Sequence, residues 1–225
     1  RMSGLLSGGY QGLPVWRGGR QFFSRRQPGQ QFGVLYTVDP DGTERALIDP
    51  IELDPSGHTT LDGYQPSWEG DKLAYLLSEG GTEESVLRVM DVATREVIDG
   101  PIDRTRFSSV AWLPGGEACS YVRRQDPATI DPGEAQFHRR VRLHELGADP
   151  DTDAEIFGGG LRITNYYSVG VTSDGKWLVI DAAEGTAPRN DVYLADLAAS
   201  DPHHPTLVPV VERRDAQTSV TIRPD

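Results

Sequence analysis

The apolar residues of this chain fall in short runs that are separated by polar turns. A run holds about four to six residues and is rich in β-branched and aromatic side chains, which is the spacing of strands and not of helices. Residues 86–90 and 177–180 are two such runs. The 25 glycines and 16 prolines are spread through the chain and separate the runs from one another. The pattern predicts an all-β fold.

A unit of strand, tight turn and strand recurs along the chain. Three copies are clear and a fourth, at the N-terminal end, is weaker; they cover residues 66–75, 111–121, 171–180 and 14–23. A further strand that ends in a polar turn follows each copy, at residues 86–91, 141–146, 192–197 and 34–39. This recurring set of strands is typical of one blade of a β-propeller.

The spacing of the turn glycines supports the same fold. Successive glycines are separated by 51, 46 and 59 residues, the four being Gly19, Gly70, Gly116 and Gly175. A four-stranded blade takes about 40 to 50 residues. The third interval is long because residues 125–136 form an insertion with Pro, Asp and Gly, which we expect to be a surface loop. A β-sandwich is the alternative fold, but it does not require this recurrence.

We therefore predict a β-propeller of four-stranded blades, with about four blades present. The predicted organisation is a lead-in segment at residues 1–13 followed by blades at residues 14–225. Propellers close with about four to eight blades, so four copies make either a small ring or part of a larger one.

Several segments resemble one known family, and they occur in the family's order. Residues 106–112 read Arg-Phe-Ser-Ser-Val-Ala-Trp, which is similar to a segment written FSS-AW in the prolyl oligopeptidase family of serine peptidases. Further similar segments are Leu-Ile-Asp-Pro at 47–50, Gly-Asp-Lys-Leu-Ala-Tyr at 70–75 and Ser-Asp-Gly-Lys-Trp-Leu at 173–178. The likeness extends from about Trp16 over nearly the whole chain.

This resemblance implies a seven-bladed propeller that covers the catalytic pocket of an α/β-hydrolase domain in the same protein. Such a propeller excludes folded proteins and admits short peptides. The chain would supply the N-terminal part of that propeller, roughly its first four blades, and would have the hydrolase domain and short peptides as partners.

The resemblance also indicates candidate substrate-binding residues. Phe107 matches a phenylalanine that lines the substrate pocket in the family, while Tyr166 and Thr186 match positions near that pocket. Packing of Phe107 within its own blade is the alternative interpretation. Ala183 stands where the family has an arginine that binds a substrate carbonyl, so this chain lacks one charged donor there.

The chain lacks the sequence motif of a serine hydrolase. No Gly-x-Ser-x-Gly elbow is present, and Ser7, within Gly-Leu-Leu-Ser-Gly-Gly, has the wrong spacing, so we predict no catalytic residue in this chain. The five histidines do not form a metal-binding motif, and we expect no metal and no other cofactor; they are His58, His138, His144, His203 and His204. His144 lies on a predicted strand, where we expect a structural role.

One acidic cluster and one cysteine invite other interpretations. Asp149, Asp151 and Asp153 alternate as calcium ligands do, but the glycine and terminal glutamate of an EF-hand are absent, so we interpret them as a solvated loop. Cys119 is the single cysteine and lies in an alternating strand pattern, which predicts a buried structural thiol. A single cysteine also fits a reducing compartment, so we expect a cytoplasmic protein.

Charge excludes two classes of partner. The formal net charge is -12, and a field of that sign repels phosphate backbones and anionic lipid surfaces. No apolar run reaches the roughly 18 residues that a membrane span needs. We therefore expect neither nucleic acid nor a membrane as a partner.

Two functions remain open. In the first, the chain is the substrate-gating propeller of a prolyl oligopeptidase-like serine peptidase and is non-catalytic by itself. In the second, it is a stand-alone TolB-like propeller that acts as a protein-binding or scaffolding module. In either case, open blade edges predict self-association.

Overall fold

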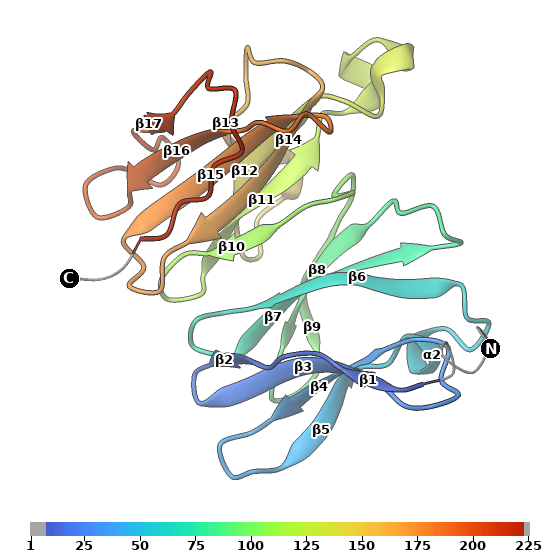
Figure 1. The fold of residues 1–225 in the computed structure, drawn as a ribbon. Coiled ribbons are helices and arrows are strands. Elements are labelled where there is room, and N and C mark those ends of the chain that lie inside the picture. Colours follow the sequence, from blue (N-terminus) through green and yellow to red (C-terminus); the bar gives the residue numbers. More distant parts are fainter. Residues whose placement is uncertain (1–7, 223–225) are drawn as a thin grey trace. The chain divides into compact units, whose positions relative to one another are not determined.

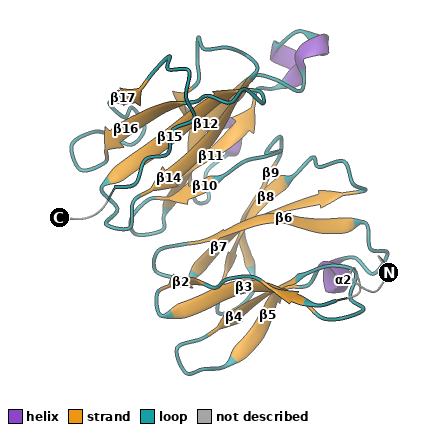
Figure 2. Ribbon diagram, viewed as in Figure 1, coloured by secondary structure: helices purple, strands orange, loops and turns teal. Residues whose placement is uncertain are grey.

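The computed structural model describes residues 8–222 of the chain. Contacts between residues divide the chain into two compact units, Arg1–Pro101 and Ile102–Asp225. Each unit contains two antiparallel sheets (Figures 1 and 2). No helix among the described residues is long and apolar enough to cross a membrane.

The first unit consists of two sheets joined by a short helix. The strands of the first sheet are β1 (Tyr10–Gln11), β2 (Val15–Arg17), β3 (Arg20–Arg26), β4 (Val34–Val38) and β5 (Glu44–Ile48). Those of the second are β6 (Thr59–Pro66), β7 (Lys72–Glu79), β8 (Val86–Asp91) and β9 (Val97–Ile102). Helix α2 (Pro50–Leu53) lies between them, and Asp49 caps it by accepting a hydrogen bond from the Ile51 amide.

The edge strand that pairs with β3 on the side away from β4 is interrupted. Both β1 and β2 pair with β3, so five strand segments occupy four positions across this sheet. Pro14 lies in the interruption, where its missing N–H removes no ladder hydrogen bond. The structure thus places Tyr10 and Gln11, which belong to the predicted lead-in, in a sheet; residues 1–7, including Ser7, lie outside the described residues.

Apolar side chains from both sheets form the core of the first unit. Phe22, Leu35 and Leu47 pack against Leu73 and Met90, and all five are buried. Alternation along the strands sends these residues to one side of each sheet.

Two hairpin turns of this unit, the one between β2 and β3 and the one between β6 and β7, approach each other closely. A Cβ atom at Gly70 would lie 2.4 Å from the carbonyl oxygen of Arg17, and one at Gly18 would lie even nearer to that of Glu69. Gly70 also has φ +72°. Glycine is therefore required here both by the turn and by the close backbone approach.

The second unit repeats the same plan. Its first sheet contains β10 (Val110–Trp112), β11 (Ala118–Arg124), β12 (Arg139–Glu145) and β13 (Ala154–Phe157). Its second contains β14 (Asn165–Val171), β15 (Trp177–Glu184), β16 (Asp191–Asp196) and β17 (Val208–Val211). Single 3-10 turns lie in the loops: η1 (Pro127–Thr129) and η2 (Pro132–Glu134) between β11 and β12, and η3 (Pro150–Thr152) before β13.

The core of the second unit lies between its two sheets. Val122 and Val141 from the first sheet pack in one cluster with Tyr167, Leu178 and Ile180 from the second. Cys119 is fully buried, which confirms its predicted place in the interior.

The predicted strand pattern is confirmed. Four antiparallel sheets, each four positions wide, stand where four blades are predicted. The four turn glycines all have positive φ, between 66° and 77°. Residues 125–136 form the loop that contains η1 and η2, and its side chains are half-buried or exposed.

Candidate functional site

Phe107 lies in the loop that leads from β9 to β10. Its backbone has φ +60°, a left-handed conformation that is uncommon for a bulky residue. The Ser108 amide donates to the Thr105 carbonyl at 2.9 Å, and the fully buried Thr105 fixes the start of this turn. The phenyl ring is 53% exposed, so it is not packed inside its own blade. Strained backbone that holds an apolar ring at the surface is characteristic of functional positions.

The two serines that follow hold this loop in place. The Ser108 hydroxyl accepts a hydrogen bond from the Val122 amide of β11 at 2.9 Å. The Ser109 hydroxyl accepts one from the Val169 amide of β14 at 2.8 Å. The second bond joins the two sheets of this unit. The Phe-Ser-Ser segment therefore combines one exposed ring with two anchoring hydroxyls.

Tyr166, at the start of β14, is the aromatic neighbour of Phe107. The two ring centroids are 6.1 Å apart with the planes tilted by 44°. The Arg106 guanidinium lies 4.7 Å from the Phe107 ring centroid, and that of Arg139 lies 3.9 Å from the centroid of Tyr166. Cation–π contacts of this kind hold rings in fixed orientations, each contributing about 0.5 to 2 kcal/mol.

Gln136, at the end of the inserted loop, gathers the arginines around this aromatic pair. Its side-chain oxygen accepts hydrogen bonds from Arg106 and Arg124, both at 3.1 Å. Its carbonyl accepts one from Arg139 at 3.0 Å. Burial lowers the pKa of the Arg139 guanidinium, and the neighbouring Arg124 and Arg106 lower it further. The insertion thus supports the site beside Phe107 and Tyr166.

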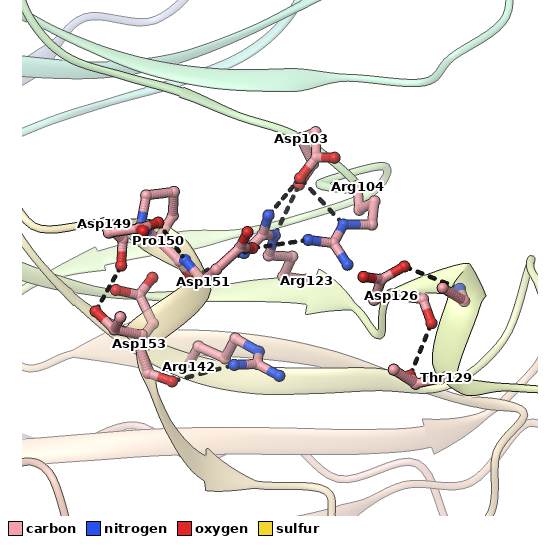
Figure 3. Close-up of polar contacts among 12 residues, drawn as sticks. Asp103, Arg104, Arg123, Asp126, Thr129, Arg142, Asp149, Pro150, Asp151 and Asp153 are labelled. Carbon is pink, nitrogen blue, oxygen red and sulfur yellow. Dashed lines mark hydrogen bonds and ion pairs between the residues drawn. The ribbon is translucent and has the colours of Figure 1, made fainter.

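An ion-pair network fixes the loop before Phe107 (Figure 3). Asp103 forms an ion pair with Arg123 and another, at 3.0 Å, with Arg104. Asp151 in η3 pairs with the same arginines, at 2.9 Å from Arg123 and 3.1 Å from Arg104. Burial acts to raise the pKa of Asp103, but the hydrogen bonds from Arg123 and Arg104 lower it below its usual value. The network ties the start of the loop to the neighbouring turn.

Thr186, the remaining predicted site residue, and Ala183, which stands in place of the family's arginine, lie at the end of β15 and just after it. Ala183 is paired directly with Tyr166 in the β14–β15 ladder. Thr186 is exposed in the turn that follows β15. Within residues 8–222, no ring contact, ion pair or hydrogen bond joins Thr186 to Phe107 or Tyr166. The structure brings Phe107 and Tyr166 together, and the assignment of Thr186 to the same site stays a prediction.

The interpretation of the acidic cluster as a solvated loop is wrong for Asp153. Asp153 is buried, accepts a hydrogen bond from the Tyr121 hydroxyl at 2.7 Å, and lies 2.9 Å from the Nδ1 atom of His144. These two partners, on the neighbouring strands β11 and β12, compensate for the burial of the Asp153 carboxylate. Burial and the nearby Asp153 raise the pKa of Tyr121. Asp149 caps η3 at the surface, as a loop residue would.

The histidines have structural surroundings. His144 is fully buried and bonded to Asp153, which confirms its predicted structural role. His138 pairs with Glu134 at 2.6 Å, and His203 pairs with Glu145 at 3.1 Å. Among the described residues, no group of three or more His, Cys, Asp and Glu side chains is placed to hold a metal ion.

Sequence reasoning missed the arginines that surround the aromatic pair. Arg123 and Arg124 on β11 stand opposite Arg140 and Arg139 on β12. Like charges opposite each other destabilise a sheet unless other groups compensate them. Two arginine pairs at the ends of otherwise apolar strands are the signal that could have indicated a functional end of this sheet.

Comparison with known proteins agrees with the fold. A family model described as the N-terminal β-propeller domain of prolyl oligopeptidase matches residues 2–223. A prolyl endopeptidase of Elizabethkingia meningoseptica is 28% identical over 209 residues, which are 92% of this chain and 29% of that protein. One of Elizabethkingia miricola is 31% identical over 186 residues, which are 82% of this chain and 26% of that protein.

Solved structures show the same relationship. A structure from a study of two prolyl endopeptidases superimposes with a TM-score of 0.79 at 27% identity, over 93% of this chain and 29% of the other. Prolyl oligopeptidase B of Galerina marginata, bound to a 35mer substrate, has a TM-score of 0.77 at 17% identity, over 92% of this chain and 32% of the other, and shows the fold alone. The chain spans less than a third of these proteins.

These matches cover nearly the whole chain and agree with the four blade-like sheets. The chain belongs to the family of prolyl oligopeptidase N-terminal β-propeller domains.

Proposed function

We propose that this chain admits short peptides to the active site of a prolyl oligopeptidase-type serine peptidase. The hydrolase domain that would carry the nucleophile is part of this proposal, because the chain spans less than a third of its relatives. The observation that carries the proposal is Phe107, an exposed ring on a strained and well-anchored turn.

The aromatic pair offers a peptide two ring faces at one end of the second unit. Phe107 is 53% exposed and Tyr166 is 37% exposed. An apolar side chain of a peptide would bury apolar surface area against these rings. That burial provides affinity for several kinds of apolar peptide residue. Because hydrogen bonds and ion pairs fix the loop before binding, little conformational entropy is lost when the peptide docks.

Peptide binding to the chain tests this proposal. A short fluorescent peptide with apolar side chains is titrated with the chain, and its anisotropy is followed. Phe107→Ala should weaken binding about fivefold to tenfold, which corresponds to about 1 kcal/mol for the loss of one aromatic contact. Trp16→Ala is the matched control, since Trp16 is an equally exposed aromatic on β2 in the other unit.

If Phe107→Ala binds the peptide as tightly as the unaltered chain does, the aromatic pair is not a peptide contact. Circular dichroism of both variants confirms that a change in binding does not come from unfolding.

A further inference from the structure

The second unit also contains a cavity whose lining adjoins Tyr166 in sequence. A cavity of about 540 Å³ opens at the end of the sheet formed by β14 to β17. Asn165, which immediately precedes Tyr166, forms part of its wall. Ala182 and Tyr193 also line it, and the Tyr193 ring packs on Phe157 with centroids 4.7 Å apart. The cavity thus combines partly apolar walls with a position one residue along β14 from the site.

Two exposed arginines share a single carboxylate at the mouth of this cavity. Arg162 lies 3.0 Å from one oxygen of Glu184, and Arg189 lies 3.6 Å from the other. Their side chains are 71% and 52% exposed. A guanidinium has five N–H donors, so this arrangement leaves most of the donors of both arginines available to a ligand.

Two acidic side chains of the lining already have donors from the protein. Asp191 accepts a hydrogen bond from the Arg213 amide at 2.7 Å, and Glu212 accepts one from the Tyr193 hydroxyl at 3.3 Å. Arg213, Arg214 and Asp215 also line the cavity, so the lining holds equal numbers of basic and acidic residues. Recognition here would come from directed hydrogen bonds and not from net charge.

We propose that Arg162 and Arg189 bind a carboxylate of a peptide that also contacts Phe107 and Tyr166. The planar fork of a guanidinium matches the two oxygens of a carboxylate, and such bonds are among the strongest in proteins. This inference rests on the proposed function, and it specifies the substrate class further: peptides with an acidic group next to an apolar residue. The acidic group is either a side chain or the C-terminal carboxylate.

Three fluorescent peptides that share one apolar core distinguish these two sources. The first has an amidated C-terminus and no acidic residue, the second has an amidated C-terminus and one aspartate, and the third has a free C-terminus and no acidic residue. We expect at least one carboxylate peptide to bind the chain about tenfold more tightly than the neutral one. The peptide that gains affinity identifies the source.

The double variant Arg162→Gln with Arg189→Gln should remove this preference and leave the affinity of the neutral peptide unchanged. Arg95→Gln is the matched control, because Arg95 is an exposed arginine that pairs with Glu52 in the first unit. Equal binding of all three peptides to the unaltered chain would overturn the inference. So would a carboxylate preference that persists in the double variant.

These results separate the two proposals. Phe107→Ala should weaken all three peptides by the same factor, since the ring contacts the shared apolar core. If Phe107→Ala has no effect while the carboxylate preference depends on Arg162 and Arg189, the proposed function of the aromatic pair fails. In that case the cavity keeps its assignment as a carboxylate site.

Discussion

Asp54 organises the loop between α2 and β6 through one carboxylate. It accepts hydrogen bonds from the Ser56 hydroxyl at 2.5 Å, from the amides of Ser56 and His58 at 2.9 Å, and from the Thr59 amide at 3.0 Å. The Ser56 hydroxyl and these amides lower the pKa of Asp54 from 3.8 to about 2. Four donors on one charged group make this loop sensitive to acid.

The pH dependence of stability follows from that shift. A pKa that is lower in the folded chain than in the unfolded chain adds stability above the unfolded value of 3.8, and this contribution is lost as the pH falls toward 2. Asp54→Asn should therefore lower the Tm at pH 7 and have little effect near pH 2. Thermal unfolding of both proteins at several pH values checks this. An equal Tm difference at all pH values would contradict it.

The buried contacts of Asp153 with His144 and Tyr121 should stabilise the fold. Asp153→Ala removes the buried carboxylate that accepts a hydrogen bond from the Tyr121 hydroxyl and contacts Nδ1 of His144. Each of the two buried interactions lost costs about 1 to 3 kcal/mol, so we expect a loss of about 2 to 6 kcal/mol in the free energy of unfolding. Urea denaturation measures it. The control Asp126→Ala removes only the surface cap of η1, which contributes about 1 kcal/mol.

At the scale of elements, two turn glycines separate the cost of a steric clash from the cost of a strained backbone. Gly70 and Gly80 both have positive φ, at 72° and 62°. A Cβ atom at Gly70 would lie 2.4 Å from the Arg17 carbonyl oxygen, whereas one at Gly80 has no atom within 4 Å. Gly80→Ala should cost about 1 kcal/mol from strain alone, and Gly70→Ala should cost clearly more. Equal losses in urea denaturation would show that the close approach is not rigid.

The Ser109 hydroxyl is expected to stabilise the edge of β14. Its bond to the Val169 amide joins the two sheets of the second unit. Ser109→Ala should speed hydrogen exchange at the Val169 amide while leaving the Val122 amide protected. Ser108→Ala should do the reverse, because Ser108 bonds Val122. NMR detection of amide exchange reads both sites, and unchanged protection at Val169 would contradict the assigned role of Ser109.

Local features of the elements were predictable from the sequence, and long-range ones were not. The strand periods and the glycine turns depend on residues that are close in sequence, so the pattern indicates them directly. Asp153 was misassigned because its partners are 9 and 32 residues away. Phe107 and Tyr166 were identified through a family resemblance, but Arg139, which stacks on Tyr166, lies on another strand, 27 residues before it, and follows no local pattern.

For the whole molecule, the edge strands of the sheets favour self-association of the chain. Strand β9 and strand β17 are each outermost in their sheets, and each exposes two apolar side chains. These are Val97, Ile98, Val208 and Val210. Unpaired apolar edges promote association between chains. We predict self-association by light scattering, reduced by Val208→Lys with Val210→Lys. A monodisperse monomer at all concentrations would contradict this.

We propose that one end of the second unit contacts the peptide and that the catalytic residues lie outside this chain. A peptide with a photoreactive phenylalanine analogue, irradiated in the presence of the chain and mapped by mass spectrometry, tests the first part directly. We expect cross-links on residues 106–109 and 161–166 and no cleavage of the peptide. Cross-links elsewhere, or cleaved peptide, would contradict it.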